Sequence, residues 1–273
     1  MRKWWVAMNR KIVLPNGKEV KPPFKLTWVI TLIVILLIAL SIYITDFDIS
    51  LLVTNANRAS EYFSQLFNFN EKTYAFIPNI YKPLLQTIAM SLVGSLAGML
   101  LAFPVGIICA ININNNFFSW ILRCIFNILR TLPILIVGLI FKYIFGASNF
   151  SGFVAILITT FLIGIKMLYE YIETLNLASY ESALATGLNK FQAIVSTIIP
   201  NIRSYFVSQT LYMFEVNVRM ATILGLVGGG GIGLVLNDQL TVNPAKAGMI
   251  LIFMFVVVLT IELITGFLRK RLA

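Results

Sequence analysis

The stretch LTWVITLIVILLIALSIYIT, residues 26–45, decides the class of fold, because it contains no charged side chain. As a helix it would rise about 30 Å, the thickness of the hydrocarbon layer of a membrane. A cleaved signal peptide has a shorter apolar core and a small-residue cleavage site, and neither feature is present. We therefore expect an uncleaved first transmembrane helix, preceded by a basic cytoplasmic tail over residues 1–25.

The composition of the whole chain agrees with a membrane protein. Hydrophobic residues make up 59% of the 273 residues and charged residues only 12%, whereas a soluble domain carries roughly 25% charged residues. This excludes a soluble globular protein and a disordered chain. The absence of histidine excludes imidazole bases and histidine-ligated zinc. Cys109 and Cys124 lie in or beside apolar runs, so we expect buried thiols rather than a disulfide or a redox pair.

Five further apolar runs follow the first, so we expect an all-α integral membrane protein with about six transmembrane helices. These runs cover residues 84–110, 119–145, 153–168, 205–218 and 247–268. The mixed polar and aromatic segment 46–83 is expected to be an extracellular loop. Gly94 and Gly98, four residues apart, would let two helix backbones approach closely. For residues 219–236 the sequence leaves open a continued helix, a broken helix or a re-entrant segment.

The basic residues indicate the orientation of these spans. Of the 21 lysines and arginines, fifteen fall on one side: seven before the first span, five in the inner loops and at inner helix ends, and three after the last span. Cytoplasmic loops carry such an excess of positive charge. Both termini are therefore expected in the cytoplasm. The net charge of +10 is then a signal of topology, and no nucleic acid is needed to explain it.

The longest inner connection, residues 169–203, is predicted to contain a compact helical element. Gly187 would permit a turn between two short helices, and Pro200 is expected to end the second one. An amphipathic stripe supports the helical assignment and consists of Leu184, Leu188, Phe191, Val195 and Ile198. The pattern alone is equally compatible with an interfacial helix lying on the lipid.

This connection resembles a known motif. The triplet Glu181-Ser182-Ala183, followed by Gly187 and then by Ile199-Pro200, resembles the EAA loop of ABC importer permeases. Ser182 stands where the family usually has alanine. The resemblance implies a coupling helix that docks on the ATPase subunit, and the residues assigned to docking are Glu181, Ser182, Ala183, Gly187 and Pro200.

A second run narrows the subfamily. The segment LYMFEVNVRMATILGLVGGGGIG, Leu211 to Gly233, resembles the phosphonate-type permeases, although Phe214 stands where tryptophan is common. The resemblance covers roughly residues 80–270. It implies a type I importer permease with its core over residues 84–273, moving phosphonates or related phosphorus oxyanions by alternating access.

The resemblance also implies the partners. They are two copies of an ABC ATPase subunit that binds the ATP, a second permease copy, and an extracellular or periplasmic solute-binding protein. The complex would lie in the cell membrane, as a multi-pass assembly. The permease itself would be no enzyme and would hold no cofactor or metal.

Glu215 and Arg219 interrupt an apolar run and are four residues apart, so on a helix they share one face and can form an ion pair. Two hypotheses follow from this spacing. The pair could neutralise itself within the membrane and hold one helix together. Alternatively, the guanidinium of Arg219 could lie beside the translocation path and steer an anion.

A glycine-rich stretch follows this helix. Gly228, Gly229, Gly230, Gly231 and Gly233 also satisfy a GxGxxG pattern. No strand precedes them, so we reject a dinucleotide site, and the sequence contains no P-loop motif. We expect instead a pliable or closely packed backbone near the outer gate.

Two other function classes fit parts of the sequence. An ion-coupled secondary transporter could use Glu215, Arg219 and Glu262 as a relay, but it predicts internal repeats, and the two halves show none. A membrane-embedded enzyme would need clustered carboxylates, and the inner side offers only Glu170, Glu173 and Glu181. The resemblance to importer permeases favours transport driven by a separate ATPase.

Overall fold

The computed structural model describes residues 12–13, 19–20, 24–45, 49–114 and 117–272, which divide into one unit up to Glu61 and a second unit from Tyr62 onward. The first unit begins with two short antiparallel strands, β1 (Ile12–Val13) and β2 (Glu19–Val20), in which Ile12 pairs with Val20. Most of the expected basic tail over residues 1–25 lies outside the described residues.

Helix α2 (Phe24–Ile44) corresponds to the first predicted span. Its side chains from Trp28 to Ile44 are exposed all around the helix and carry no charge. A helix that is apolar on every side suits hydrocarbon rather than water. Helix α3 (Ile49–Thr54) follows, and α4 (Ala56–Leu66) continues the chain into the second unit.

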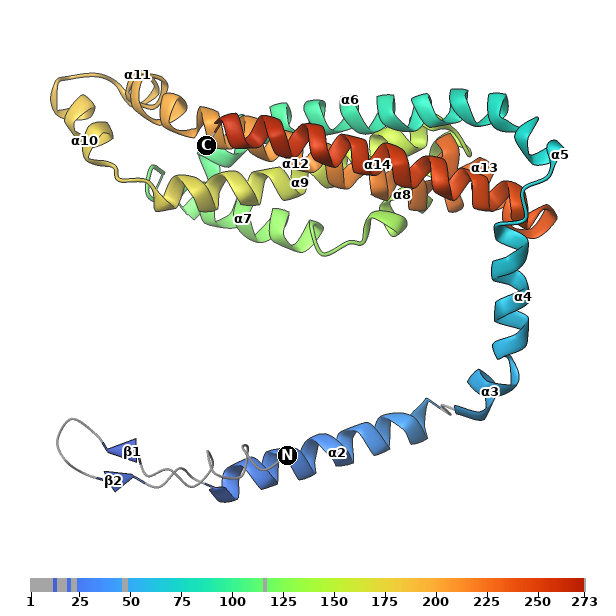
Figure 1. Ribbon diagram of the computed structural model, residues 1–273. Helices are drawn as coiled ribbons and strands as arrows, with labels where there is room; N and C mark the ends of the chain where they lie inside the picture. Colours follow the sequence, from blue (N-terminus) through green and yellow to red (C-terminus); the bar gives the residue numbers. More distant parts are fainter. Residues whose placement is uncertain (1–11, 14–18, 21–23, 46–48, 115–116, 273) are drawn as a thin grey trace. The chain divides into compact units, whose positions relative to one another are not determined.

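The regular elements described in the second unit are all helices (Figure 1). Its elements after α4 are α5 (Glu71–Tyr74), α6 (Ile77–Cys109), α7 (Phe117–Leu129), α8 (Ile134–Phe145), α9 (Asn149–Thr174), α10 (Ala178–Ala185), α11 (Lys190–Ala193), a π-helical turn (Ile194–Ile198), α12 (Ile199–Leu226), α13 (Gly231–Val242) and α14 (Pro244–Leu272). Helices α10 and α11 lie at one end of the bundle and α5 at the other. The predicted all-α class is confirmed, apart from the two-residue strands.

The segment 46–83, predicted to be an extracellular loop, contains helical structure: α3, α4, α5 and the first turns of α6. Helix α4 contains alanine, glutamate, arginine and serine, and it is amphipathic. Its residues favour a helix, but its mean hydropathy is too low for a membrane span. Its last residue, Leu66, is buried against α14.

Three described helices, α6, α9 and α14, are long and apolar enough to cross a membrane, and two bent helix pairs raise the number to five. The third predicted span, residues 119–145, consists of two helices, α7 and α8, which meet at 84°. Pro133 is the N-cap of α8. It has no N–H to donate to the preceding turn, so the helix restarts there.

The prediction that Pro200 ends the second short helix is wrong. Helix α12 continues directly from α11 through the π-helical turn, so that Lys190 to Leu226 form one helical run. The N–H of Ile199 bonds to the carbonyl of Ile194, one residue further back than in an α-helix. This wider turn accommodates Pro200 inside the helix instead of ending it.

Helices α6 and α9 pack closely along small residues. A Cβ atom at Gly98 would lie 2.7 Å from the carbonyl oxygen of Leu157, and one at Gly94 would lie 2.8 Å from Ile156. The predicted close approach at these two glycines is therefore confirmed, and it is made between two helices of the same chain.

A buried polar group joins α12 to this pair of helices. The Nδ2 atom of Asn217 donates to the hydroxyl oxygens of Ser95 on α6, at 2.8 Å, and Thr160 on α9, at 2.7 Å. Ser91 in turn donates to the backbone carbonyl of Asn217 at 3.2 Å. These bonds fix the rotation of α12 against α6 and α9, because buried polar groups are costly when unpaired.

Candidate functional site

The connection between α9 and α12 forms a helix–turn–helix element at one end of the bundle. Helix α10 ends in a left-handed residue, Gly187, with a φ of 91°. The N–H of Leu188 bonds to the carbonyl of Ala183, and the N–H of Gly187 bonds to that of Leu184. These are the bonds of a Schellman motif, in which glycine is favoured at the left-handed position.

Helix α11 starts immediately after this turn. The N–H of Gln192 donates to the side-chain oxygen of Asn189, and the N–H of Asn189 donates to the side-chain oxygen of Gln192. This reciprocal pair is a capping box, which satisfies helix donors that would otherwise have no acceptor. The Schellman motif that ends α10 is therefore followed directly by the capping box that begins α11. Together they define the turn between the two helices.

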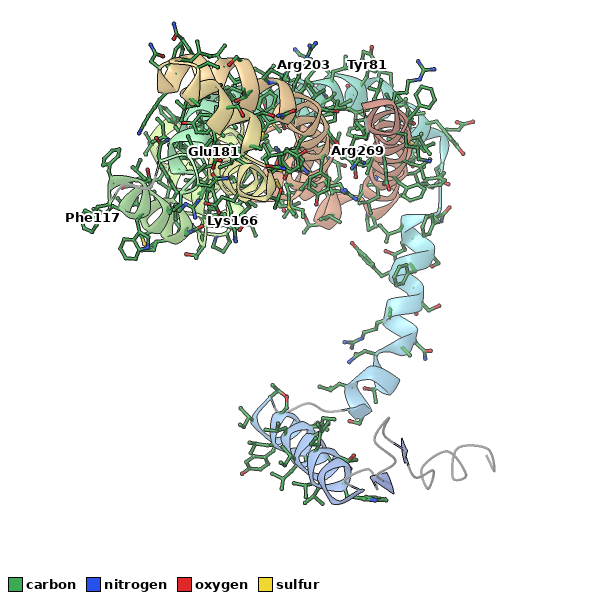
Figure 2. All side chains as sticks on the ribbon, turned by 90° about the vertical axis from the view of Figure 1, so that its left-hand side faces the viewer. Tyr81, Phe117, Lys166, Glu181, Arg203 and Arg269 are labelled. Atoms are coloured by element: carbon green, nitrogen blue, oxygen red, sulfur yellow. The ribbon has the colours of Figure 1, made fainter. Side chains whose placement is uncertain are left out.

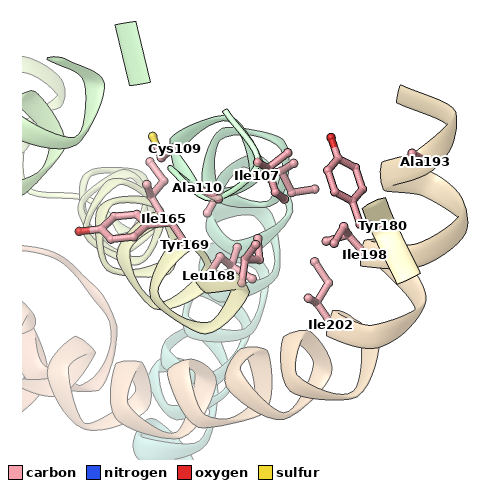
Figure 3. Packing of buried hydrophobic residues seen from close by; sticks show 13 residues of the cluster. Ile107, Cys109, Ala110, Ile165, Leu168, Tyr169, Tyr180, Ala193, Ile198 and Ile202 are labelled. Carbon is pink, nitrogen blue, oxygen red and sulfur yellow. The ribbon is translucent and has the colours of Figure 1, made fainter. Parts of the chain in front are cut away.

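Tyr180 fastens this element to the bundle. Its side chain is only 5% exposed and belongs to a buried cluster with Ile198 and Ile202 of the α12 run and Ile107 of α6. Figure 3 shows the Tyr180 ring close to Ile198 and Ile107, with Ala193 on the neighbouring helix. The element therefore packs on α6 and on the α12 run, which fix its position.

The residues that the motif singles out lie mainly on the outside of this element. Glu181, Ser182, Gly187 and Pro200 are exposed, and Ala183 is half-buried. The predicted apolar stripe is only partly buried: Ile198 lies in the core, but Leu188, Phe191 and Val195 are exposed. The residue that anchors the element, Tyr180, was missed because the predicted stripe begins at Leu184, although Tyr180 lies four residues earlier on the same helix, α10.

A second group of polar side chains lies on α12 and α14. Glu215 binds two guanidinium groups: Arg219 lies 2.7 Å from its Oε1 and Arg269 lies 2.8 Å from its Oε2. The hydroxyl of Thr265 also donates to Oε2, at 3.3 Å. The structure thus contains the ion pair between Glu215 and Arg219 that the sequence spacing suggests, together with a second cation.

Sequence reasoning did not find Arg269. It lies in the last turn of α14, beside Lys270 and Arg271. In a sequence, such a basic run indicates the cytoplasmic end of a membrane span and does not indicate a partner for Glu215. Its distance of 54 residues from Glu215 gives no periodic pattern. The ring of Tyr212 lies 5.8 Å from the Arg269 guanidinium and gives it a further contact across the two helices.

The glycine-rich stretch is a break between α12 and α13, whose axes differ by 46°. For residues 219–236 the structure excludes a continued straight helix and agrees with a broken helix or a re-entrant segment. The N–H of Gly231 donates to the side-chain oxygen of Asn149 at 2.7 Å, and the N–H of Ile232 donates to the hydroxyl of Thr87 at 2.8 Å. Both groups belong to other helices, so the turn is closely held.

Carboxylates near the inner helix ends take part in ion pairs. Glu173 pairs with Arg123 and accepts the N–H of Ile111, and Glu170 pairs with Lys166 at 3.2 Å. Across the described part of the chain, no group of three or more histidine, cysteine, aspartate or glutamate side chains could hold a metal ion. Glu262, the third member of the suggested ion relay, is exposed on α14.

Comparison with known proteins identifies the family. A family model described as "Binding-protein-dependent transport system inner membrane component" matches residues 102–273. The chain belongs to this family. The matched region begins within α6 and contains both α10–α11 and the Glu215 group. Membership favours an ABC transport component over the secondary transporter and the membrane-embedded enzyme.

Individual proteins that are similar to this chain are named as transport permeases. The chain is 32% identical to the "Phosphate-import permease protein PhnE" of Mycolicibacterium smegmatis, over 68% of this chain and 36% of the relative, so it spans about a third of that relative's length. It is 30% identical to the "Phosphite transport system permease protein PtxC" of Stutzerimonas stutzeri, over 70% of each chain.

Solved structures support the fold. A chain of the MetNI methionine ABC transporter in inward-facing conformation matches with a TM-score of 0.64 and 17% identity, covering 75% of this chain and all of that chain. The transport component therefore has the fold of an ABC importer permease, as the sequence predicts. At this identity the match concerns the fold alone.

Proposed function

We propose that the chain is the transmembrane permease subunit of an ATP-driven importer for phosphorus oxyanions: phosphonates, phosphite or phosphate. One observation supports this substrate class above others. The relatives at 30% identity or more that align over two thirds of this chain are named for phosphate and for phosphite. These ligands share a tetrahedral, anionic phosphorus centre.

The α10–α11 element is the proposed docking site for the ATPase. Glu181 and Ser182 are exposed and polar there, Ala183 and Gly187 follow them, and the side chain of Phe191 is exposed on α11. An exposed aromatic beside a fixed turn suits a protein partner. Two ATPase copies and a second permease copy would complete the transporter. A solute-binding protein would deliver the anion to the extracellular or periplasmic face of the cell membrane.

The translocation path is proposed to pass Glu215 and Arg219. The outer gate is assigned to Gly228, Gly229, Gly230, Gly231 and Gly233. Because Asn149 and Thr87 hold this turn, opening would require these two side chains to release it or to move with it.

A transport assay tests the function. The chain would be purified with the ATPase and binding protein encoded beside it, reconstituted into liposomes, and given radiolabelled phosphite, phosphate or methylphosphonate. We expect uptake of at least one anion that requires both ATP and the binding protein. Uptake by the permease chain alone, without the ATPase, would contradict the proposal.

A further inference from the structure

The group formed by Glu215, Arg219 and Arg269, here called the Glu215 cluster, is unbalanced in charge. One carboxylate meets two guanidinium groups, one on each oxygen. Glu262, two turns along α14 from Arg269, makes no ion pair with the cluster in the described part of the chain. The cluster therefore carries one positive charge in excess, which a single anion could neutralise.

Burial divides the cluster into a closed side and an open side. The Glu215 side chain is 6% exposed, whereas those of Arg219 and Arg269 are 46% and 30% exposed. The carboxylate is thus covered, and the guanidinium groups face outward. The Nε atom of Arg269 is buried and has no hydrogen-bond acceptor among the described residues. The Glu215 cluster therefore combines an excess positive charge with an N–H donor of Arg269 that has no acceptor within the described ranges.

The location of the cluster limits what its open side can face. Thr265 and Arg269 both contact Glu215, so the cluster lies beside the last two turns of α14. Figure 1 places this end of α14 at the same end of the bundle as α10 and α11, and Figure 2 shows Arg269 from that end. A guanidinium exposed within a span needs water or protein around it, because hydrocarbon excludes charge.

We propose that Arg219 and Arg269 form a binding site for a phosphate-type oxyanion on the substrate's route, near the α10–α11 end of the permease. Arginine suits this ligand, because its planar group donates paired hydrogen bonds to two oxygens of one anion. Glu215 is a positioning residue, which holds the two guanidinium groups on opposite oxygens. This inference rests on the proposed function.

The acid also has a role in release. Two guanidinium groups without a counter-ion would hold an anion firmly, whereas a conduit must let its ligand leave. Glu215 offsets one of the two charges. We therefore expect the site to bind phosphate weakly in the wild type and more tightly when the carboxylate is neutralised.

The test measures binding and uptake separately, in the assembled transporter in nanodiscs and in liposomes. The variants are Arg269→Gln, Arg269→Lys and Glu215→Gln. The control is Arg271→Gln, which removes an exposed charge from the same turn. Binding of radiolabelled inorganic phosphate is measured without the binding protein, and uptake is measured with it. Thermal unfolding and basal ATP hydrolysis identify variants that fail to fold.

Arg269→Gln is expected to weaken phosphate binding by about tenfold or more, because the anion loses one of its two charged hydrogen-bond donors. Arg269→Lys should restore part of this loss, and Arg271→Gln should bind as the wild type does. Glu215→Gln should bind phosphate more tightly and transport it more slowly. If the cluster only joined α12 to α14, Glu215→Gln would not raise the affinity for phosphate while lowering the transport rate.

The outcomes separate this inference from the proposed function. If the wild type transports phosphite or phosphate and folded Arg269→Gln binds and transports like it, the anion site is wrong and the importer stands. If the wild type transports none of the anions, the proposed function itself is wrong. Nanodiscs with and without anionic lipid distinguish the ligand's source: competition by lipid headgroups would overturn a site on the substrate's route.

Discussion

Gly187 is constrained by its backbone conformation and not by lack of space. Its φ of 91° lies in the left-handed region, yet no atom lies within 4 Å of the position that a Cβ would take. A side chain there costs about 1–2 kcal/mol through the backbone alone. Gly146, the C-cap of α8, has a φ of 75° and the same open surroundings. The two glycines form a matched pair at different ends of the bundle.

We expect Gly187→Val to insert in the membrane normally and to lose ATP hydrolysis stimulated by the binding protein, because the turn between α10 and α11 would change. The measurement is ATPase activity of the reconstituted complex, with and without binding protein. Gly146→Val should lose similar stability and keep its stimulation. Equal coupling in both variants would remove Gly187 from the proposed docking role.

Asn217 is the residue on which the packing of α12 depends. Replacing it by alanine would leave the hydroxyls of Ser95 and Thr160 without their buried donor. We expect a loss of about 1–3 kcal/mol in the free energy of unfolding, measured as a lower thermal midpoint in detergent. Asn201→Ala, at an exposed position of the same helix, is the control and should unfold like the wild type.

At the scale of elements, the sequence predicts which segments are apolar helices much better than where they bend. Apolar runs predict α2, α6, α9 and α14, because length and hydropathy alone are enough to recognise a membrane helix. The bend before Pro133 and the break after Leu226 depend on local hydrogen bonds and on distant partners. Hydropathy does not record either of them.

The same limit applies to the candidate site. The motif residues Glu181 and Gly187 can be found from the sequence because they follow a short pattern. Arg269 cannot, because its contact with Glu215 depends on how α14 packs on α12. Tyr180 differs from Arg269, because it lies four residues before Leu184 on α10 and the helical spacing could have included it.

Tyr180 and Phe191 are expected to have separate roles within the α10–α11 element. Tyr180 is buried, and Phe191 is 75% exposed. Tyr180→Ala should loosen the element, because removing a buried aromatic typically costs about 3–5 kcal/mol, and limited proteolysis between α9 and α12 should become faster. Tyr180→Phe keeps the ring and should resist the protease as the wild type does.

Phe191→Ala should leave proteolysis unchanged and weaken assembly with the ATPase, as measured by co-purification. Leu251→Ala is the control, because it removes an exposed apolar side chain from α14, outside the element. If Phe191→Ala assembles as well as Leu251→Ala, this face of α11 is not the docking surface.

For the whole molecule, the charge distribution predicts an orientation that labelling can measure. In a background lacking Cys109 and Cys124, we expect Glu181→Cys to react with a membrane-impermeant maleimide only in inside-out vesicles. Lys72→Cys, on α5 at the opposite end of the bundle, should react only in intact cells. Labelling of both positions from one side would contradict the predicted topology.

The closed turn before α13 has an electrostatic consequence for the molecule as a whole. A half-helix that begins inside a membrane protein usually offers an anion the positive end of its dipole. Here the first free N–H groups of α13 already donate to Asn149 and Thr87, so the dipole points at neutral oxygens of the same chain. At this break, attraction of an anion must then come from full charges on side chains, and its strength can be altered by replacing one charged residue at a time.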